Sequence, residues 1–96
     1  MLLSELQTAF LLEMAKKYIW WKKPEESILH PRRILAQIMN LGVWDDWCAM
    51  SEWFTLKDLA DILRSAEAGQ FSGRSWHFWA NRLLGEIPPM PTRVFQ

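Results

Sequence analysis

The chain has 96 residues, enough for a single domain, and half of them are hydrophobic, so a packed core is expected rather than disorder. Its 11 basic and 11 acidic residues give a net charge of zero, which argues against broad electrostatic binding of nucleic acid but allows a local basic patch. Cys48 is the only cysteine, so an intramolecular disulfide is excluded. With two separated histidines, the chain has no zinc-ligand spacing, and we expect neither a metal nor a cofactor.

The hydrophobic segments of the chain are short. None approaches the 18 residues that a membrane-spanning helix requires. The N-terminal stretch is apolar, but Glu5, Gln7 and Glu13 interrupt it, and it lacks the basic start and the cleavage site of a secretory signal. We therefore expect a cytoplasmic protein without membrane contact, in a setting where a lone cysteine stays reduced.

The first predicted helix covers residues 5–21. Ser4 and Gln7 match a capping box, in which each side chain accepts a hydrogen bond from the backbone N–H of the other residue. Pro24 should end the helix, and residues 24–30 form a connector with room for one helical turn. Apolar residues recur every three or four positions and define one buried face: Leu3, Leu6, Phe10, Met14, Tyr18 and Trp21.

Two further helices are predicted in the middle of the chain. One begins at Pro31, because proline is favoured in the first turn, and ends at Gly42, which we expect to be a left-handed cap. The next is short and covers residues 45–53. Asp45 is its expected cap, and Asp46 is a first-turn acid that suits the helix dipole.

The last two predicted helices also carry capping signals. Thr55 and Asp58 form a second capping box, and the helix that they start should end before Gly69. Ser72 is the expected cap of the last helix, residues 73–84. Since strand-like alternation and internal repeats are lacking, the sequence predicts an all-α fold, a small irregular bundle of four to five helices.

The C-terminal segment has a different composition. We assign residues 1–87 to the helical domain and residues 88–96 to an extended tail, because three prolines favour a polyproline conformation. Two uses of this tail remain open. It could lie in a groove of a partner and contact it through Arg93 and Phe95, or it could fold back onto its own core.

Combinations of residues that support catalysis are not found in the sequence. Residues 72–75 resemble a phosphate-binding loop only superficially and are better explained as a helix start. Asp45 and Asp46 are neighbours that project about 100° apart on a helix, so they cannot easily share a metal or a proton. Cys48 has no nearby base, and we interpret it as a small core residue. We therefore do not expect an enzyme.

Seven tryptophans are the unusual feature of the composition. Tryptophan is seldom fully buried and is enriched in interface hot spots, although all seven could also be core or boundary residues. Trp20 falls on the polar face of the first helix, and one short helix cannot turn Trp44, Trp47 and Trp53 inward together. The predicted contacts with a protein partner, or with a second copy of the chain, are Trp20, Trp44, Trp47, Trp53, Arg93 and Phe95.

DNA binding is the alternative hypothesis. The last two helices could form a helix-turn-helix, in which the final helix presents its polar side chains to a groove of DNA. The residues that would make these contacts are Arg74, His77, Asn81 and Arg82. The net charge of zero and the tryptophans of the same helix speak against this hypothesis.

Several motifs between residues 20 and 84 occur together in order. They are Trp20-Trp21, His30-Pro31-Arg32-Arg33, Gly42, Trp44-Asp45-Asp46-Trp47, and the segment from Phe71 to Trp79 that reads FSGRSWHFW. This series resembles a family of small bacterial helical proteins that are often encoded beside nucleotidyltransferase toxins of the abortive-infection type. The resemblance implies an antitoxin-like protein that blocks the toxin by direct binding. It also implies operator DNA as a second partner, because antitoxins often repress their own operon.

Overall fold

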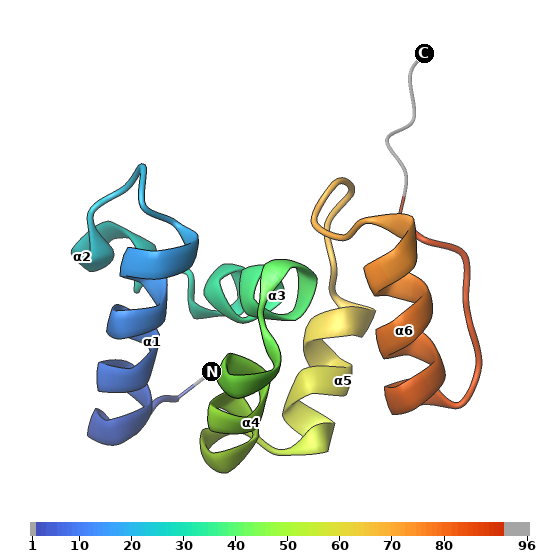
Figure 1. Ribbon diagram of the computed structural model, residues 1–96, viewed down its shortest axis with the longest axis horizontal. Coiled ribbons are helices and arrows are strands. Elements are labelled where there is room, and N and C mark those ends of the chain that lie inside the picture. The colour runs from blue at the N-terminus through green and yellow to red at the C-terminus, as the bar shows by residue number, and fades with distance from the viewer. Residues whose placement is uncertain (1, 92–96) are drawn as a thin grey trace.

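The computed structural model describes residues 2–91, which form six helices and no strand. The helices are α1 (Glu5–Tyr18), α2 (Pro24–Ser27), α3 (Pro31–Leu41), α4 (Trp44–Trp53), α5 (Leu56–Arg64) and α6 (Gly73–Leu84) (Figure 1). The all-α prediction is confirmed, with one helix more than expected because a short helix forms in the connector before α3. Within the described range, no helix is long and apolar enough to cross a membrane.

Helix α3 lies at the centre of the molecule. It packs against each of the other five helices, with α1 and α2 on one side and α5 and α6 on the other (Figure 1). Its buried side chains occupy more than half of its circumference, as expected for a helix that neighbours surround. These side chains are Ile34, Leu35, Ala36, Ile38 and Met39.

The predicted helix starts are confirmed where they depend on capping side chains. Ser4 Oγ accepts from the backbone N–H of Gln7 at 3.1 Å, and Gln7 Oε1 accepts from the backbone N–H of Ser4 at 2.9 Å. Thr55 and Asp58 make the same reciprocal pair at 3.1 and 3.0 Å. Ser72 caps α6 as predicted. Each of these bonds satisfies backbone donors that have no partner inside the helix.

The first helix is shorter than predicted. It ends at Tyr18, because Ile19 leaves the helical conformation (φ −131°, ψ 55°) and its side chain is 7% exposed. The turn that follows carries Trp20 and Trp21 out of the helix and onto the surface. Pro24 is the first residue of α2, a position where its missing N–H costs nothing.

Gly42 is not the left-handed cap that the sequence suggested. Its backbone is extended (φ −67°, ψ 157°), and the requirement for glycine is one of space. A Cβ atom at this position would lie 2.2 Å from the carbonyl oxygen of Ile38 and 2.6 Å from Nε1 of Trp47. The indole N–H of Trp47 donates to that carbonyl at 2.8 Å, so a side chain from α4 adds a second donor to an oxygen that already accepts from the backbone N–H of Gly42 at 2.7 Å.

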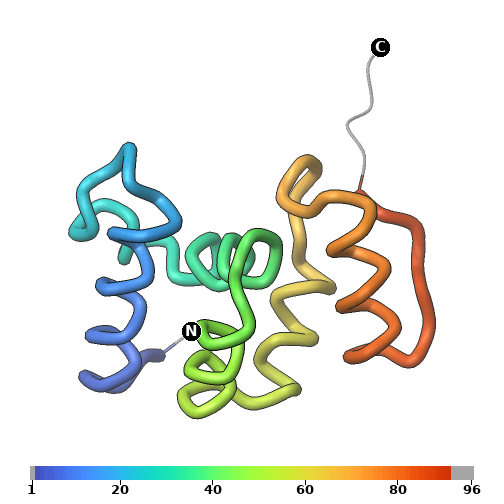
Figure 2. Tube along the Cα trace, viewed as in Figure 1, coloured from blue at the N-terminus to red at the C-terminus, as the bar shows by residue number. Residues whose placement is uncertain are grey.

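The C-terminal segment turns back along α6. Gly85 adopts a left-handed conformation (φ 71°), and the residues after it return beside the helix in the opposite direction (Figure 2). The indole N–H of Trp76 donates to the carbonyl oxygen of Pro88 at 2.8 Å, which holds this segment against its own domain. Arg93 and Phe95, the tail contacts predicted from the sequence, lie outside the described residues.

Candidate functional site

The indole of Trp47 and the ring of Phe78 stack between α4 and α6. Their ring centroids are 5.4 Å apart with an interplanar angle of 24°. Trp79 lies edge-on to both rings, at 5.0 Å from Trp47 and 5.1 Å from Phe78. Because Trp79 is 5% exposed and belongs to the core, it holds the stacked pair in a fixed position. The stack is the centre of a surface that we call the α4–α6 face.

Two hollows flank this stack. One, of about 110 Å³, lies between α4, α5 and α6 and is lined by Trp44, Leu56 and Arg82. The other, of about 360 Å³, lies beside the end of α3 and is lined by Leu41 and Arg74. Trp47 and Phe78 line both hollows, so the stacked rings form the ridge between them.

The side chains around the ridge are more exposed than a core would allow. Trp44 is 66% exposed, Leu56 67% and Leu41 58%. A contiguous apolar surface of this kind usually marks an interaction site. Among the described residues, no carboxylate lines either hollow, and the charged groups there are Arg74 and Arg82. The α4–α6 face is thus aromatic and aliphatic at its centre, with a cation at each hollow.

The structure does not gather the predicted partner-binding tryptophans on one surface. Trp44 and Trp47 lie on the α4–α6 face. Trp20 is 76% exposed, as its place on the polar side of the first predicted helix suggested, but it packs edge-on against Trp21 on the turn after α1. Trp53 is partly buried against the core at the end of α4.

Phe78 is the main residue of this face that was not among the partner contacts predicted from the sequence. The helical pattern of α6 contained a signal for it, because Phe78 falls outside the apolar stripe that Trp76, Trp79 and Ala80 define. A large aromatic residue on the polar side of an amphipathic helix is a candidate contact. Its stacking with Trp47 could not be read from the sequence, because it depends on how α4 and α6 are placed.

The residues of the DNA-binding hypothesis are all exposed on α6. Arg74 and Arg82 border the α4–α6 face, and the Arg82 guanidinium lies 6.0 Å from the Phe78 ring centroid. His77 and Asn81 lie further around the helix. The eight-residue connection from Arg64 to Gly73, residues 65–72, exceeds the three- or four-residue turn that is usual in a helix-turn-helix.

Cys48 is exposed, not a core residue as the sequence suggested. It faces the smaller hollow of the α4–α6 face, while Met50, two positions further along α4, takes the fully buried place. Within residues 2–91, no three side chains of His, Cys, Asp or Glu lie close enough together to hold a metal ion.

Asp46 connects α4 to α1. Its carboxylate accepts a hydrogen bond from the hydroxyl of Tyr18 and one from Nζ of Lys17 at 2.6 Å. The Lys17 ammonium and then the Tyr18 hydroxyl hold the pKa of Asp46 below its ordinary value. Asp45, which we expected to cap the helix, is instead a first-turn residue, and the cap position belongs to Val43.

We expect Asp46→Asn to be less stable than the wild type by about 1–3 kcal/mol at pH 7, because it removes a charged acceptor from Tyr18 and Lys17. Because the pKa of Asp46 is lowered in the folded protein, its interactions contribute their full stability above the ordinary carboxyl pKa. This contribution is lost as the pH falls through the pKa of the folded state. The urea unfolding curves of the wild type and Asp46→Asn should therefore differ at pH 7 and converge at about pH 2. Asp45→Asn is the matched control, and a penalty for Asp46→Asn that persists unchanged in acid would contradict the assignment.

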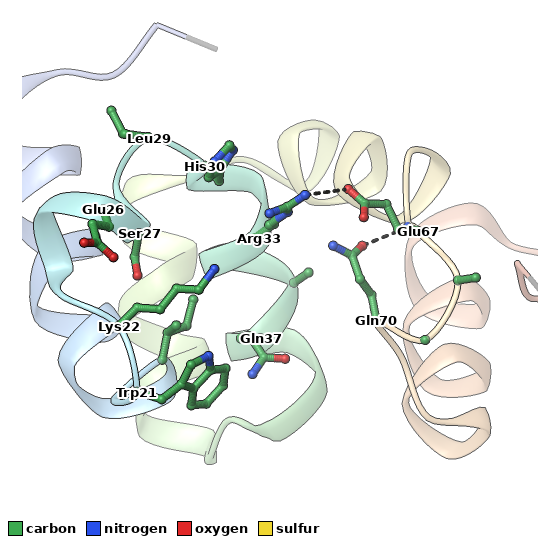
Figure 3. Close-up of a pocket in the computed structure, with 14 residues that line it drawn as sticks. Trp21, Lys22, Glu26, Ser27, Leu29, His30, Arg33, Gln37, Glu67 and Gln70 are labelled. Atoms are coloured by element: carbon green, nitrogen blue, oxygen red, sulfur yellow. Dashed lines mark hydrogen bonds and ion pairs between the residues drawn. The ribbon is translucent and has the colours of Figure 1, made fainter. Parts of the chain in front are cut away.

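A second concave site lies on the other side of α3 from α4. It is a groove of about 440 Å³ between the α1–α2 corner and the connection from α5 to α6 (Figure 3). Trp21 and Lys22 form one wall, Glu67 and Gln70 form the other, and α3 contributes its floor. The sequence did not predict this groove, because its walls are far apart in the chain.

Comparison of the chain with protein-family models, with curated proteins and with solved structures gave no significant match.

Proposed function

We propose that this protein is a non-catalytic binding module that recognises a partner protein through the α4–α6 face. The observation that carries the proposal is the Trp47–Phe78 stack, which stands between two hollows and is surrounded by exposed apolar side chains. Energetically dominant interface residues are enriched in tryptophan and arginine and lie in well-packed places. The face combines both residue types.

The charges of the face favour a particular kind of partner. Arg74 and Arg82 lie at its two hollows, and the hollows contain no carboxylate from the described residues. Complementary charge between two surfaces gives specificity and speeds encounter. A partner that presents an apolar patch with nearby carboxylates would therefore fit this face best.

We propose a nucleotidyltransferase toxin as the partner class, with neutralisation by direct binding in the cytoplasm. This step rests on the sequence resemblance described above. Two of the resembling motifs, Trp44 to Trp47 and Phe71 to Trp79, contain the two ridge residues. The second motif also contains Arg74, one of the two arginines of the α4–α6 face. These two motifs therefore contribute to the candidate contact surface, which favours a role in binding for Trp44, Trp47 and Phe78.

The test is a binding measurement with a nucleotidyltransferase encoded near this gene. Trp44→Ala and Phe78→Ala should each weaken binding by about 10–100-fold, because truncating an interface anchor costs about 1.4–2.8 kcal/mol. Trp20→Ala is the matched control, since Trp20 is exposed to a similar degree but lies away from the face. Isothermal titration calorimetry of the four proteins gives the comparison.

Two results would contradict the proposal. Equal losses for Trp20→Ala and Trp44→Ala would remove the α4–α6 face from the interface. If calorimetry detected association between two copies of this chain but no binding to the nucleotidyltransferase, the face would be a contact between two copies instead. In either case the toxin-binding proposal through this face would be abandoned.

DNA binding is the second candidate, favoured by the exposure of all four predicted contacts on α6. His77 and Asn81 distinguish the two functions, because they lie off the α4–α6 face. If operator DNA is the partner, His77→Ala and Asn81→Ala should weaken binding to a promoter fragment in fluorescence anisotropy, while Trp44→Ala should not. The exposed aliphatic residues Leu41 and Leu56 favour the protein-binding function, because phosphates offer them no contact.

A further inference from the structure

We propose that the groove between the α1–α2 corner and the α5–α6 connection binds a small ligand in which a planar heteroaromatic ring carries one anionic group. A nucleoside monophosphate has this chemistry. The groove has a volume of about 440 Å³, within the range of small-molecule sites. It is separate from the α4–α6 face, so this proposal does not depend on the function proposed above.

Trp21 provides an aromatic wall. Its side chain is 56% exposed and lines the groove, and the edge-on ring of Trp20, 5.7 Å away, limits how it can turn. Aromatic side chains in such positions stack on the flat face of a base. A planar ring in the groove could therefore lie against the indole of Trp21.

Two cationic side chains line the groove. Figure 3 shows Lys22 reaching in from the α1–α2 corner, while the guanidinium of Arg33 is directed toward the Glu67 carboxylate at the opposite wall. Lys22 makes no ion pair within the described residues. The ion pair of Arg33 with Glu67 is 3.7 Å long, and the two side chains are 51% and 62% exposed, so it competes only weakly with a bound anion.

The groove also contains carboxylates, which restrict the charge of the ligand. Glu26 and Glu67 line it together with Lys22 and Arg33, so the fixed charges nearly balance. One anionic group near the two cations would be favourable. Each additional negative charge would approach the carboxylates, and so the site should not prefer a triphosphate to a monophosphate.

Two glutamine side chains of the groove, Gln37 and Gln70, can form hydrogen bonds to the edge of a ligand ring. Gln70 accepts through Oε1 from the backbone N–H of Glu67 at 2.9 Å, which leaves its amide N–H groups for a ligand. Gln37 donates through Nε2 to the carbonyl of Tyr18 at 3.3 Å, which leaves its Oε1 as an acceptor. Gln70 thus offers a donor and Gln37 an acceptor, the two kinds of group that hydrogen-bond to the edges of nucleobases.

Ser27 is the buried polar residue of the groove wall. Its residue is 4% exposed and lines the groove from α2, and its hydroxyl has no hydrogen-bond partner within the described part of the chain. Buried polar groups in native proteins are nearly always paired, so an unpaired one calls for an explanation. Because the hydroxyl oxygen is shielded from solvent, it is not a contact for a ligand in the open groove.

The first experiment is calorimetric titration of the full chain with AMP, adenosine, inorganic phosphate and ATP. We expect AMP to bind at least about tenfold more tightly than adenosine or phosphate alone, because it engages the aromatic wall and the cations together. ATP should bind no more tightly than AMP. Failure of AMP to bind at millimolar concentration, or a clear preference for ATP or phosphate, would overturn the proposal.

The chain contains a matched control for each key residue. Trp21→Ala and Lys22→Gln should each weaken AMP binding by about tenfold or more, as expected for the loss of a stacking platform or of a phosphate contact. Trp44 and Lys23 do not line the groove, so Trp44→Ala, the control for Trp21→Ala, and Lys23→Gln, the control for Lys22→Gln, should change the affinity by less than about threefold. Equal effects within either pair would place the ligand elsewhere.

The two binding surfaces can be tested separately. Trp44→Ala and Phe78→Ala remove contacts of the α4–α6 face and should leave AMP binding unchanged. Trp21→Ala should likewise leave partner binding unchanged. Loss of AMP binding in the α4–α6 variants, at unchanged thermal stability, would overturn the assignment of the ligand to this groove, whatever the outcome for the partner.

Discussion

Trp79→Ala should destabilise the protein by about 3–5 kcal/mol, the range measured when a large aromatic side chain is removed from a core. Trp79 is 5% exposed, and its indole N–H donates to the carbonyl oxygen of Met39 at 2.7 Å inside the core. The variant would lose this hydrogen bond and leave a cavity beneath Trp47 and Phe78. For a chain of this length, total stability is about 5–14 kcal/mol, so the loss is a large share of it.

Urea unfolding followed by circular dichroism measures this effect. Trp79→Phe separates the two contributions, because it keeps much of the ring packing and removes the N–H group, and it should cost about 1–3 kcal/mol. Trp44→Ala is the control, since a residue that is 66% exposed should change the stability by less than about 0.5 kcal/mol. A loss below about 1 kcal/mol for Trp79→Ala would show that this side chain is not part of the core.

Gly42→Ala is expected to reduce stability by about 2–4 kcal/mol, although alanine would normally be tolerated in this backbone conformation. The added Cβ would lie 2.2 Å from a backbone oxygen, that of Ile38, which cannot move aside cheaply. It would also displace Trp47 and break the hydrogen bond from its indole to the Ile38 carbonyl oxygen. The small gain from a stiffer unfolded chain does not offset this overlap.

Gly73→Ala provides the matched comparison for Gly42→Ala. A Cβ at Gly73 would meet no atom within 4 Å, and the residue lies in the first turn of α6. This substitution should therefore be neutral or stabilise the protein by up to about 1 kcal/mol. The same change in the midpoint of thermal unfolding for both substitutions would contradict the close approach of Trp47 to Gly42.

The features that the sequence predicted correctly are local ones. The capping boxes at Ser4 and Thr55 depend on residues three positions apart, so the pattern of residue types was sufficient to locate them. Trp20 is exposed as predicted, but for a different reason, because it lies on the turn after α1 and not on the polar side of a helix. The all-α fold rests on several such signals together.

The features that the sequence did not predict depend on tertiary contacts. Gly42 has a local sequence typical of a helix cap, but its conformation is set by the indole of Trp47 from the next helix. Cys48 was placed in the core because cysteine is usually buried, whereas the packing of α4 turns it outward. The groove of Figure 3 joins walls from opposite sides of α3, and no sequence pattern records that proximity.

The central position of α3 has a consequence for how the molecule can open. The closest backbone packing joins α1 with α2, α5 with α6, and α3 with the other helices, and side chains of α4 add contacts to α1 through Asp46 and to α6 through Trp47. Either outer pair could therefore separate from α3 in a local opening event without disturbing the opposite pair. Unfolding of α3 itself would remove the common partner of both pairs, so α3 should form the last cooperative unit to lose its structure.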